Sequence, residues 1–394
     1  MPKILRIINR FNLGGPTYNV AYLSKYMAPE FETLLIGGKN GKTEGSSNYI
    51  VQNLGLHPII IPEMQREISY RNDYLAYQKI KNIIKRYQPD IVHTHASKAG
   101  VLGRLAASRQ NVPVIVHTFH GHVFHSYFSK SKSRFYKGIE RNLAKKTSKI
   151  IAISDIQKQE LSIDHGIAAE KNISVIPLGF DLERFQTDYC SKRHSFREHY
   201  GIADDVVSIG IVGRLVSVKN HELFINALAR VRQVTNKKFE AYIIGDGELK
   251  EKLIAQARNS GLTVSENPAK GLTAEINFTS WIKNIDWAFA GLDIACLTSH
   301  NEGTPVSLIE AQAANTPIVS TNVGGIENAV IPGRTALLSE TNQLEGFFKN
   351  LVEMINNETL RKHMATQGWP FVKDKFHYTR LVGDMTKLYN QLMP

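Results

Sequence analysis

The segment from Leu292 to Gly325 constrains the fold more than any other part of this 394-residue chain. Residues 293–297 form a short apolar run with turn-forming residues after it, which is typical of a buried strand in a parallel sheet. A polar loop follows over residues 298–303. A strand followed by such a loop predicts a position at the carboxyl edge of a sheet, where parallel α/β folds bind their ligands.

The next residues predict a helix that begins at Thr304 and Pro305. Threonine accepts a hydrogen bond from an early helical amide, and proline at the first helical position has no amide to leave unpaired. We expect the helix to end near Ala314, because Asn315 tolerates a left-handed conformation and Pro317 cannot continue a helix.

The start of this helix predicts an anion-binding site. We expect the backbone amides of Val306, Ser307 and Leu308 to point toward the carboxyl edge of the sheet, where they favour a phosphate. Glu302 and Glu310 flank these amides, and their carboxylates suit the hydroxyl groups of a sugar and of a ribose on the two sides of a diphosphate. The alternative is that both are solvated residues placed by the helix dipole.

The length of the chain predicts two domains, and strand and helix patterns alternate in each of them. The first alternation begins with an apolar run at residues 4–8 and the second begins at Val207. The polar and charged run over residues 186–198 is the expected linker. The end of the chain, from Leu344, is predicted to be helical with an interruption at residues 368–370.

Two loops at strand ends have residues suited to a diphosphate. Gly14 and Gly15 follow the first strand and allow close approach of a phosphate or sugar, although a plain tight turn is the more frequent explanation of such a pair. Gly213 allows a turn after the first strand of the second domain, and Arg214 and Lys219 project from the loop that follows. Two cations there suit a diphosphate clamp, and the alternative is a pair of solvated surface cations. The G-x-G-x-x-G pattern is missing from the first loop, which argues against a nicotinamide or flavin enzyme.

Histidines gather at the predicted ends of two neighbouring strands of the first domain. Such density suggests a metal site, but no carboxylate or thiolate at ligand spacing accompanies the imidazoles, which favours substrate contact instead. We predict that His120 faces the reacting sugar. The histidines concerned are His93, His95, His117, His120, His122 and His125.

The formal net charge of +12 favours anionic partners without choosing among them. The stretch from Lys130 to Lys149 interleaves cations with apolar residues, which is typical of a helix on an anionic membrane surface or of an ordinary surface helix. Aromatic residues at the spacing of a nucleic-acid motif are missing, so no nucleic-acid partner is expected.

The chain has no run of eighteen apolar residues, and its start does not match a cleavable signal. We therefore expect a cytoplasmic protein. If the stretch from Lys130 to Lys149 binds lipid, the protein would contact the inner face of the membrane.

Taken together, these residues resemble the retaining GT-B glycosyltransferases of family 4, over most of the chain. GRLVSVKN at residues 213–220 and NEGTPVSLIEAQAANTPIVSTNVGG at residues 301–325 carry the resemblance, and the second contains the family's pair of glutamates with seven residues between them, Glu302 and Glu310. The sequences PDIVHTHASKAG and HTFHG resemble the subgroup that assembles capsule, O-antigen or exopolysaccharide. One departure is Ser280, where family members often have a glycine.

The resemblance implies a GT-B fold, in which two Rossmann-like doubly wound α/β domains face a cleft and the last helix crosses back to the N-terminal domain. It implies an acceptor domain at residues 1–186, joined by the helix at about 371–394, and a nucleotide-sugar domain at residues 200–370. It also assigns roles to individual residues. Arg214 and Lys219 would hold the donor diphosphate next to Gly213, Glu302 a sugar hydroxyl and Glu310 the ribose. The phosphate would lie against Gly303, Thr304, Val306 and Ser307, with Gly15 contacting it from the other domain and His120 beside the anomeric carbon.

The implied reaction transfers a sugar, with retention of its configuration, from a nucleotide-sugar donor to a glycan or lipid-linked acceptor. UDP is the nucleotide that the resemblance favours. Because Arg214 and Lys219 replace the charge of a divalent metal, we expect no metal and no other cofactor. Two alternatives remain: a GT-B nucleotide-sugar 2-epimerase, which needs no acceptor, and a non-catalytic protein that binds nucleotide sugars or nucleic acid.

Overall fold

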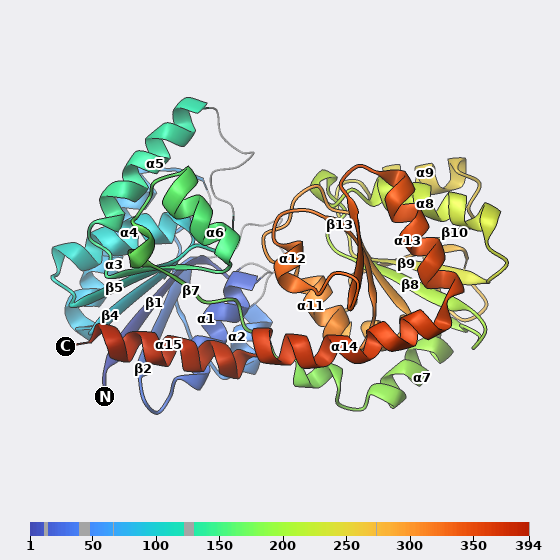
Figure 1. Cartoon of the computed structure of the whole chain (residues 1–394). Coiled ribbons are helices and arrows are strands. Elements are labelled where there is room, and N and C mark those ends of the chain that lie inside the picture. The colour runs from blue at the N-terminus through green and yellow to red at the C-terminus, as the bar shows by residue number, and fades with distance from the viewer. Residues whose placement is uncertain (12–14, 39–47, 66, 122–129, 273, 394) are drawn as a thin grey trace. The chain divides into compact units, whose positions relative to one another are not determined.

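The computed structural model describes residues 1–11, 15–38, 48–65, 67–121, 130–272 and 274–393. The chain divides into two compact units (Figure 1). The first contains Met1–Phe180 and Lys375–Pro394, and the second contains Asp181–Asp374.

The first unit has a seven-stranded parallel sheet in the order β3-β2-β1-β4-β5-β6-β7. Its strands are β1 (Lys3–Arg10), β2 (Glu32–Gly38), β3 (Ile59–Ile61), β4 (Ile91–His95), β5 (Val114–Thr118), β6 (Lys149–Ala152) and β7 (Ile173–Val175). Its α-helices are α1 (Gly15–Tyr26), α2 (Asn48–Asn53), α3 (Tyr70–Tyr87), α4 (Ser97–Arg109), α5 (Lys130–Ala144), α6 (Asp155–Gln159) and α15 (Tyr378–Leu392).

Alternation along β1 divides the first core between the two faces of the sheet. Leu5 and Ile7 pack with the apolar residues of α3 and α4, whereas Ile4 packs with those of α1 and α15. The last helix is tied to β1 by a buried hydrogen bond from Arg6 to the hydroxyl of Tyr389, at 2.8 Å. The prediction that the last helix joins the N-terminal domain is therefore confirmed.

The second unit has another seven-stranded parallel sheet, in the order β10-β11-β9-β8-β12-β13-β14. Its strands are β8 (Val207–Val212), β9 (Phe239–Ile244), β10 (Val264–Ser265), β11 (Ile276–Ser280), β12 (Ile294–Leu297), β13 (Ile318–Asn322) and β14 (Ala336–Glu340). Its α-helices are α7 (Tyr189–Tyr200), α8 (His221–Val234), α9 (Lys250–Asn259), α10 (Ile285–Gly291), α11 (Val306–Ala313), α12 (Ile326–Ala329) and α13 (Leu344–Asn356), and α14 (Glu358–Phe376) leads into the first unit. Two parallel α/β sheets of this kind confirm the predicted two-domain fold class.

Two local predictions are wrong. The run expected to be a linker forms α7, because Phe196 and Tyr200 are buried against Tyr242 and Trp287 of the second unit. The interruption expected at residues 368–370 does not occur, and α14 continues through Pro370. Buried residues on both sides of the proline hold this helix, and packing of this kind outweighs the loss of one hydrogen bond.

No helix in the described ranges is both long and apolar enough to span a bilayer.

Candidate functional site

Two loops of the second unit are joined at the carboxyl edge of its sheet. They follow β8 and β12, which are neighbouring parallel strands. The Thr298 hydroxyl donates to the backbone carbonyls of Lys219 and Asn220, at 3.1 and 2.9 Å, and the His300 amide donates to the carbonyl of Val218 at 2.9 Å. The loop with the predicted cations and the loop with the predicted carboxylate therefore form one surface.

Lys219 and Glu302 are paired on this surface. The Lys219 ammonium lies 2.6 Å from Oε1 of Glu302, and the Ser299 hydroxyl donates to the same oxygen at 2.6 Å. The Glu302 side chain is about 10% exposed and that of Lys219 about 21%. Sequence reasoning did not single out Ser299, although its place between a strand end and Glu302 is the signal that would have found it.

Arg214 is exposed on the loop after β8. Its side chain has no hydrogen bond or ion pair within the part of the chain that the structure describes. The backbone around it is tightly held, because a Cβ atom on Gly245 would lie 1.9 Å from the carbonyl oxygen of Gly213, and one on Gly247 would lie 2.5 Å from that of Leu215. A rigid loop thus carries an unengaged guanidinium.

The helix α11 begins one residue later than predicted. Pro305 is the N-cap and Val306 the first helical residue, so Thr304 does not cap the helix. The carbonyl of Pro305 accepts a hydrogen bond from the Leu308 amide at 3.1 Å, which means that the predicted free amide of Leu308 is engaged. Val306 and Ser307 are half-buried, and the geometry of a helix start leaves their amides without partners inside the helix.

Two glycines hold the loop in front of this helix. A Cβ atom on Gly324 would lie 2.1 Å from the carbonyl oxygen of Glu302, and one on Gly325 would lie 1.7 Å from that of Gly303. The Gly325 amide donates to the Glu302 carbonyl at 2.9 Å. The turn after β13 therefore supports the backbone of Glu302 at a distance that only glycine permits.

Glu310 lies on α11 with its side chain largely buried. Burial raises the pKa of its carboxyl to about 7, and Arg184, 3.6 Å away, opposes the rise only in part. Asp286 raises the pKa further by its negative charge. Glu310 is thus a carboxyl whose protonation changes near neutral pH.

Ser280 occupies a position where a glycine was expected, and its backbone has a conformation that is typical of glycine. Its φ angle is 55°, in the left-handed region. Its hydroxyl accepts a hydrogen bond from the Lys250 ammonium at 3.0 Å, and its carbonyl accepts one from the Gly245 amide at 3.0 Å. These bonds hold a serine where a side chain is ordinarily unfavourable.

The first unit contains the remaining predicted residues. Gly15 is the buried first residue of α1, whereas Gly14, His122 and His125 lie outside the described residues. Nδ1 of His95 and Nε2 of His120 are 2.9 Å apart. Within the described ranges, no three His, Cys, Asp or Glu side chains form a group suited to a metal ion.

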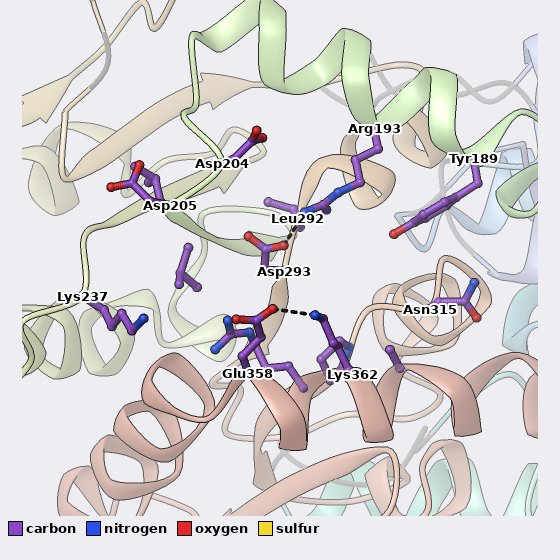
Figure 2. A pocket seen from close by; sticks show the side chains of 15 residues that line it. Tyr189, Arg193, Asp204, Asp205, Lys237, Leu292, Asp293, Asn315, Glu358 and Lys362 are labelled. Carbon is purple, nitrogen blue, oxygen red and sulfur yellow. Dashed lines mark hydrogen bonds and ion pairs between the residues drawn. The ribbon is translucent and has the colours of Figure 1, made fainter.

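A cavity of about 440 Å³ lies elsewhere in the second unit, beside α7, α14 and the starts of β8 and β12 (Figure 2). Four of its charged lining residues form two ion pairs, Arg193 with Asp293 at 2.7 Å and Lys362 with Glu358 at 2.6 Å. None of the predicted site residues lines it. We therefore place the candidate site at the opposite edge of the sheet, where the Arg214 side chain and the amides of Val306 and Ser307 have no partner among the described residues.

Known proteins match both units. A family model described as glycosyl transferases group 1 matches residues 192–369, and one described as Glycosyltransferase Family 4 matches residues 13–184. A protein of Escherichia coli, named UDP-Gal:alpha-D-GlcNAc-diphosphoundecaprenol alpha-1,3-galactosyltransferase, is 30% identical over 76% of this chain and 75% of its own length. The chain is a family 4 glycosyltransferase.

Other relatives of this glycosyltransferase agree with that result. The capsular polysaccharide biosynthesis glycosyltransferase CapM of Staphylococcus aureus is 26% identical over 85% of each chain. A glycosyltransferase structure from Rickettsia africae has a TM-score of 0.79 at 20% identity and covers 99% of this chain and 98% of its own. The structure of HepE from Anabaena in complex with UDP has a TM-score of 0.80 at 18% identity, with 99% of this chain and 100% of that chain covered. The GT-B fold is thereby shown.

Proposed function

We propose that this family 4 enzyme is a retaining glycosyltransferase that moves a hexosyl or N-acetylhexosaminyl group from a UDP-sugar to a lipid-linked or glycan acceptor. The product would be part of a surface polysaccharide. The pair formed by Lys219 and Glu302, beside the start of α11, carries the proposal.

The pair leaves each partner with capacity for a substrate. An ammonium group has three protons, and the 2.6 Å contact with Glu302 uses one of them. Oε1 of Glu302 accepts from Lys219 and from Ser299, which leaves Oε2 for a sugar hydroxyl. One contact therefore positions a phosphate-binding cation and a sugar-binding carboxylate side by side.

Negative charge develops on the diphosphate when the bond from the anomeric carbon to its phosphate oxygen breaks. Lys219, the exposed Arg214 and the amides of Val306 and Ser307 offer positive charge to that group. Such groups stabilise the leaving diphosphate more strongly in the transition state than in the bound donor. We propose that they replace a divalent metal in this role.

Retention is proposed to follow from transfer on one face of the sugar. The acceptor oxygen bonds to the anomeric carbon on the face that the diphosphate leaves, and the acceptor proton passes to the departing phosphate oxygen. Glu302 is bound to Lys219 and Ser299 and is assigned to a sugar hydroxyl, so we do not assign it as a covalent nucleophile.

The names of similar proteins support the donor and the acceptor. The Escherichia coli relative is named for a UDP-galactose donor and for an acceptor linked to diphosphoundecaprenol. The Anabaena structures with similar folds contain UDP, with glucose or as UDP-glucose. A UDP-sugar and a lipid-linked diphosphate are accordingly the substrates to test first.

The helix α5 supports a membrane location for that acceptor. Its inner face is held by the buried ion pair between Glu140 and Arg104, at 2.5 Å, and the helix stands out from its unit in Figure 1. Arg134 is exposed on α5 and Lys145 is exposed directly after its end, and Phe135, the residue after Arg134, is 66% exposed. Exposed cations next to an exposed aromatic ring suit the surface of an anionic membrane.

The test is transfer by the purified enzyme from a panel of UDP-sugars, with and without undecaprenyl-diphosphate-linked GlcNAc. We expect UDP release that depends on the acceptor and a product with the anomeric configuration of the donor by NMR. Conversion of a UDP-sugar to its 2-epimer without acceptor would identify an epimerase instead. Binding of UDP-sugars with neither reaction would identify a non-catalytic protein.

A further inference from the structure

The carboxyl ends of β4 and β5 hold a row of three imidazoles. The rings of His93 and His95 have centroids 4.0 Å apart, and those of His95 and His120 have centroids 5.2 Å apart and are stacked at 28°. His95 thus lies between a ring in the core and the ring that we assign to the reacting sugar.

The inner ring of the row is firmly held. Nδ1 of His93 lies 3.1 Å from Nη1 of Arg6 and 2.6 Å from the hydroxyl of Tyr389, and its Nε2 lies 2.8 Å from the hydroxyl of Thr118. Since the guanidinium only donates, Nδ1 of His93 accepts and Nε2 donates. This fixed ring is the surface against which His95 packs.

The contact between His95 and His120 is the one side-chain hydrogen bond that either ring makes with described residues. It joins Nδ1 of His95 to Nε2 of His120 at 2.9 Å, and it leaves Nε2 of His95 and Nδ1 of His120 without partners. His95 is fully buried, and an unpaired polar atom in that position is costly. Holding His120 is therefore the polar role that the structure gives to His95.

Both rings are neutral. Burial lowers the pKa of His120 to about 3, and burial together with the nearby charges of His93, His120 and Arg6 lowers the pKa of His95 well below its ordinary value. A neutral pair has one proton in its shared hydrogen bond. The direction of that bond decides which nitrogen of His120 carries a hydrogen.

We propose that His95 is a positioning residue for the transfer reaction, and that its Nδ1–H donates to Nε2 of His120 and fixes both the orientation and the tautomer of that ring. Both unpartnered nitrogens are shielded from solvent, but His95 is fully buried as a residue whereas His120 is half-buried, so this direction places the unpaired N–H on the ring that a substrate can approach. His120 then presents Nδ1–H, so it acts as a neutral donor of a hydrogen bond. This inference rests on the proposed function for its effect on turnover.

The test compares His95→Leu and His95→Asn with His117→Leu. Leucine removes the hydrogen bond and also the unpaired nitrogen, whereas the Asn amide reproduces the position of Nδ1. The control His117 is an equally buried imidazole with an unpartnered Nε2, and its hydrogen bond goes to Thr94 instead.

We expect His95→Leu to lower kcat roughly 10- to 100-fold, with KM for the UDP-sugar and the melting temperature unchanged. His95→Asn should recover most of the lost kcat, His117→Leu should retain it, and His95→Leu should have no further effect in a His120→Ala background. Wild-type kcat in His95→Leu, or a loss that follows the melting temperature, would overturn the proposal.

A second measurement does not depend on turnover. In protein labelled with ¹⁵N-histidine, with His120 assigned from a His120→Gln spectrum, the wild type should show a protonated Nδ1 and a bare Nε2 at His120, and His95→Leu should show a mixture of tautomers. The same tautomer in both proteins, or a protonated Nε2 in the wild type, contradicts the proposal. Absence of transfer in the wild type would count against the proposed function alone.

Discussion

The ammonium nitrogen of Lys219 lies 2.6 Å from a carboxylate oxygen of Glu302, although 83 residues separate them in the chain. The two residues come from loops after neighbouring parallel strands, and the hydroxyl of Thr298 joins those loops. The contact turns two sequence motifs into one surface, with Arg214 on the same loop as Lys219.

The two cations should differ in what they contribute to stability. Arg214→Ala should lower kcat roughly 100-fold and change the free energy of unfolding by less than about 0.5 kcal/mol, because the side chain is exposed and unengaged. Lys219→Ala should lower kcat similarly and also cost roughly 1–3 kcal/mol, because Glu302 loses its charged partner. Steady-state kinetics and urea unfolding measure both effects. Lys238→Ala, an exposed cation before β9, is the control, and wild-type turnover in both site variants would remove the proposed clamp.

Glu310 should make the protein less stable as pH rises, which is the opposite of the usual effect of a carboxylate. Its pKa in the folded protein is raised to about 7 by burial, so the folded state binds more protons than the unfolded state between pH 4.5 and 7. The free energy of unfolding therefore falls as pH rises through this range, by at most about 3 kcal/mol from this group. Glu310→Gln should raise the melting temperature at pH 8 and not at pH 4. An equal effect at both pH values would show that the carboxyl titrates normally.

The glycines after β13 should be necessary for the shape of the Glu302 loop. Gly325→Ala places a methyl group 1.7 Å from the carbonyl oxygen of Gly303 before any movement, so it should destabilise the protein and weaken UDP binding measured by calorimetry. Gly383→Ala is the matched control, because Gly383 lies exposed within α15 and its Cβ would meet nothing within 4 Å. Gly383→Ala should raise the free energy of unfolding by about 0.5–1 kcal/mol. Unaltered UDP affinity in Gly325→Ala would mean that the loop adapts.

The exposed cations on α5 and directly after its end should bind anionic vesicles. Arg134→Glu combined with Lys145→Glu should abolish sedimentation with vesicles that contain phosphatidylglycerol, and added salt should weaken binding of the wild type. Lys85→Glu combined with Arg86→Glu reverses the same charge at the exposed end of α3 and should leave binding intact. Equal binding of wild type to neutral and anionic vesicles would contradict an electrostatic contact.

Turnover should not require a divalent metal, because Arg214 and Lys219 are assigned to the leaving diphosphate. Dialysis against a chelator should leave kcat within about twofold of its starting value. Removal of one cationic side chain that stabilises the leaving group, by contrast, lowers kcat roughly 100-fold. If activity is lost in chelator and is restored by magnesium, a metal supplies the charge that we assign to these two cations.

Much of the second sheet could be predicted from local patterns. The apolar run before Thr298 forms β12, and Asn315 has the expected left-handed conformation, with φ of 55°. The helix between them exists, but its start was predicted one residue early, because Pro305 accepts the first helical bonds through its carbonyl instead of serving as the first helical residue. Local patterns locate elements well and their ends less well, since an end depends on competing hydrogen bonds.

The errors have a common physical cause, which is burial by distant residues. The charged run at residues 186–198 was predicted to be a linker, yet Phe196 within it packs against Trp287 of α10. Pro370 was predicted to stop a helix, yet buried contacts on both sides carry α14 through it. The residues that bury Phe196 and those that pack against α14 are too distant in the sequence to be recognised from a short local pattern.

The amino-acid sequence by itself determined the alternation of strands and helices, the two-domain α/β class and the residue types suited to a sugar diphosphate, because apolar periodicity and turn chemistry are local. Only the tertiary structure decided that Glu302 contacts both Lys219 and Ser299, that His95 contacts His120, and that the Arg214 side chain has no partner among the residues the structure describes. Those relationships depend on which strands are neighbours in a sheet and on how deeply each side chain is buried, and long-range packing sets both.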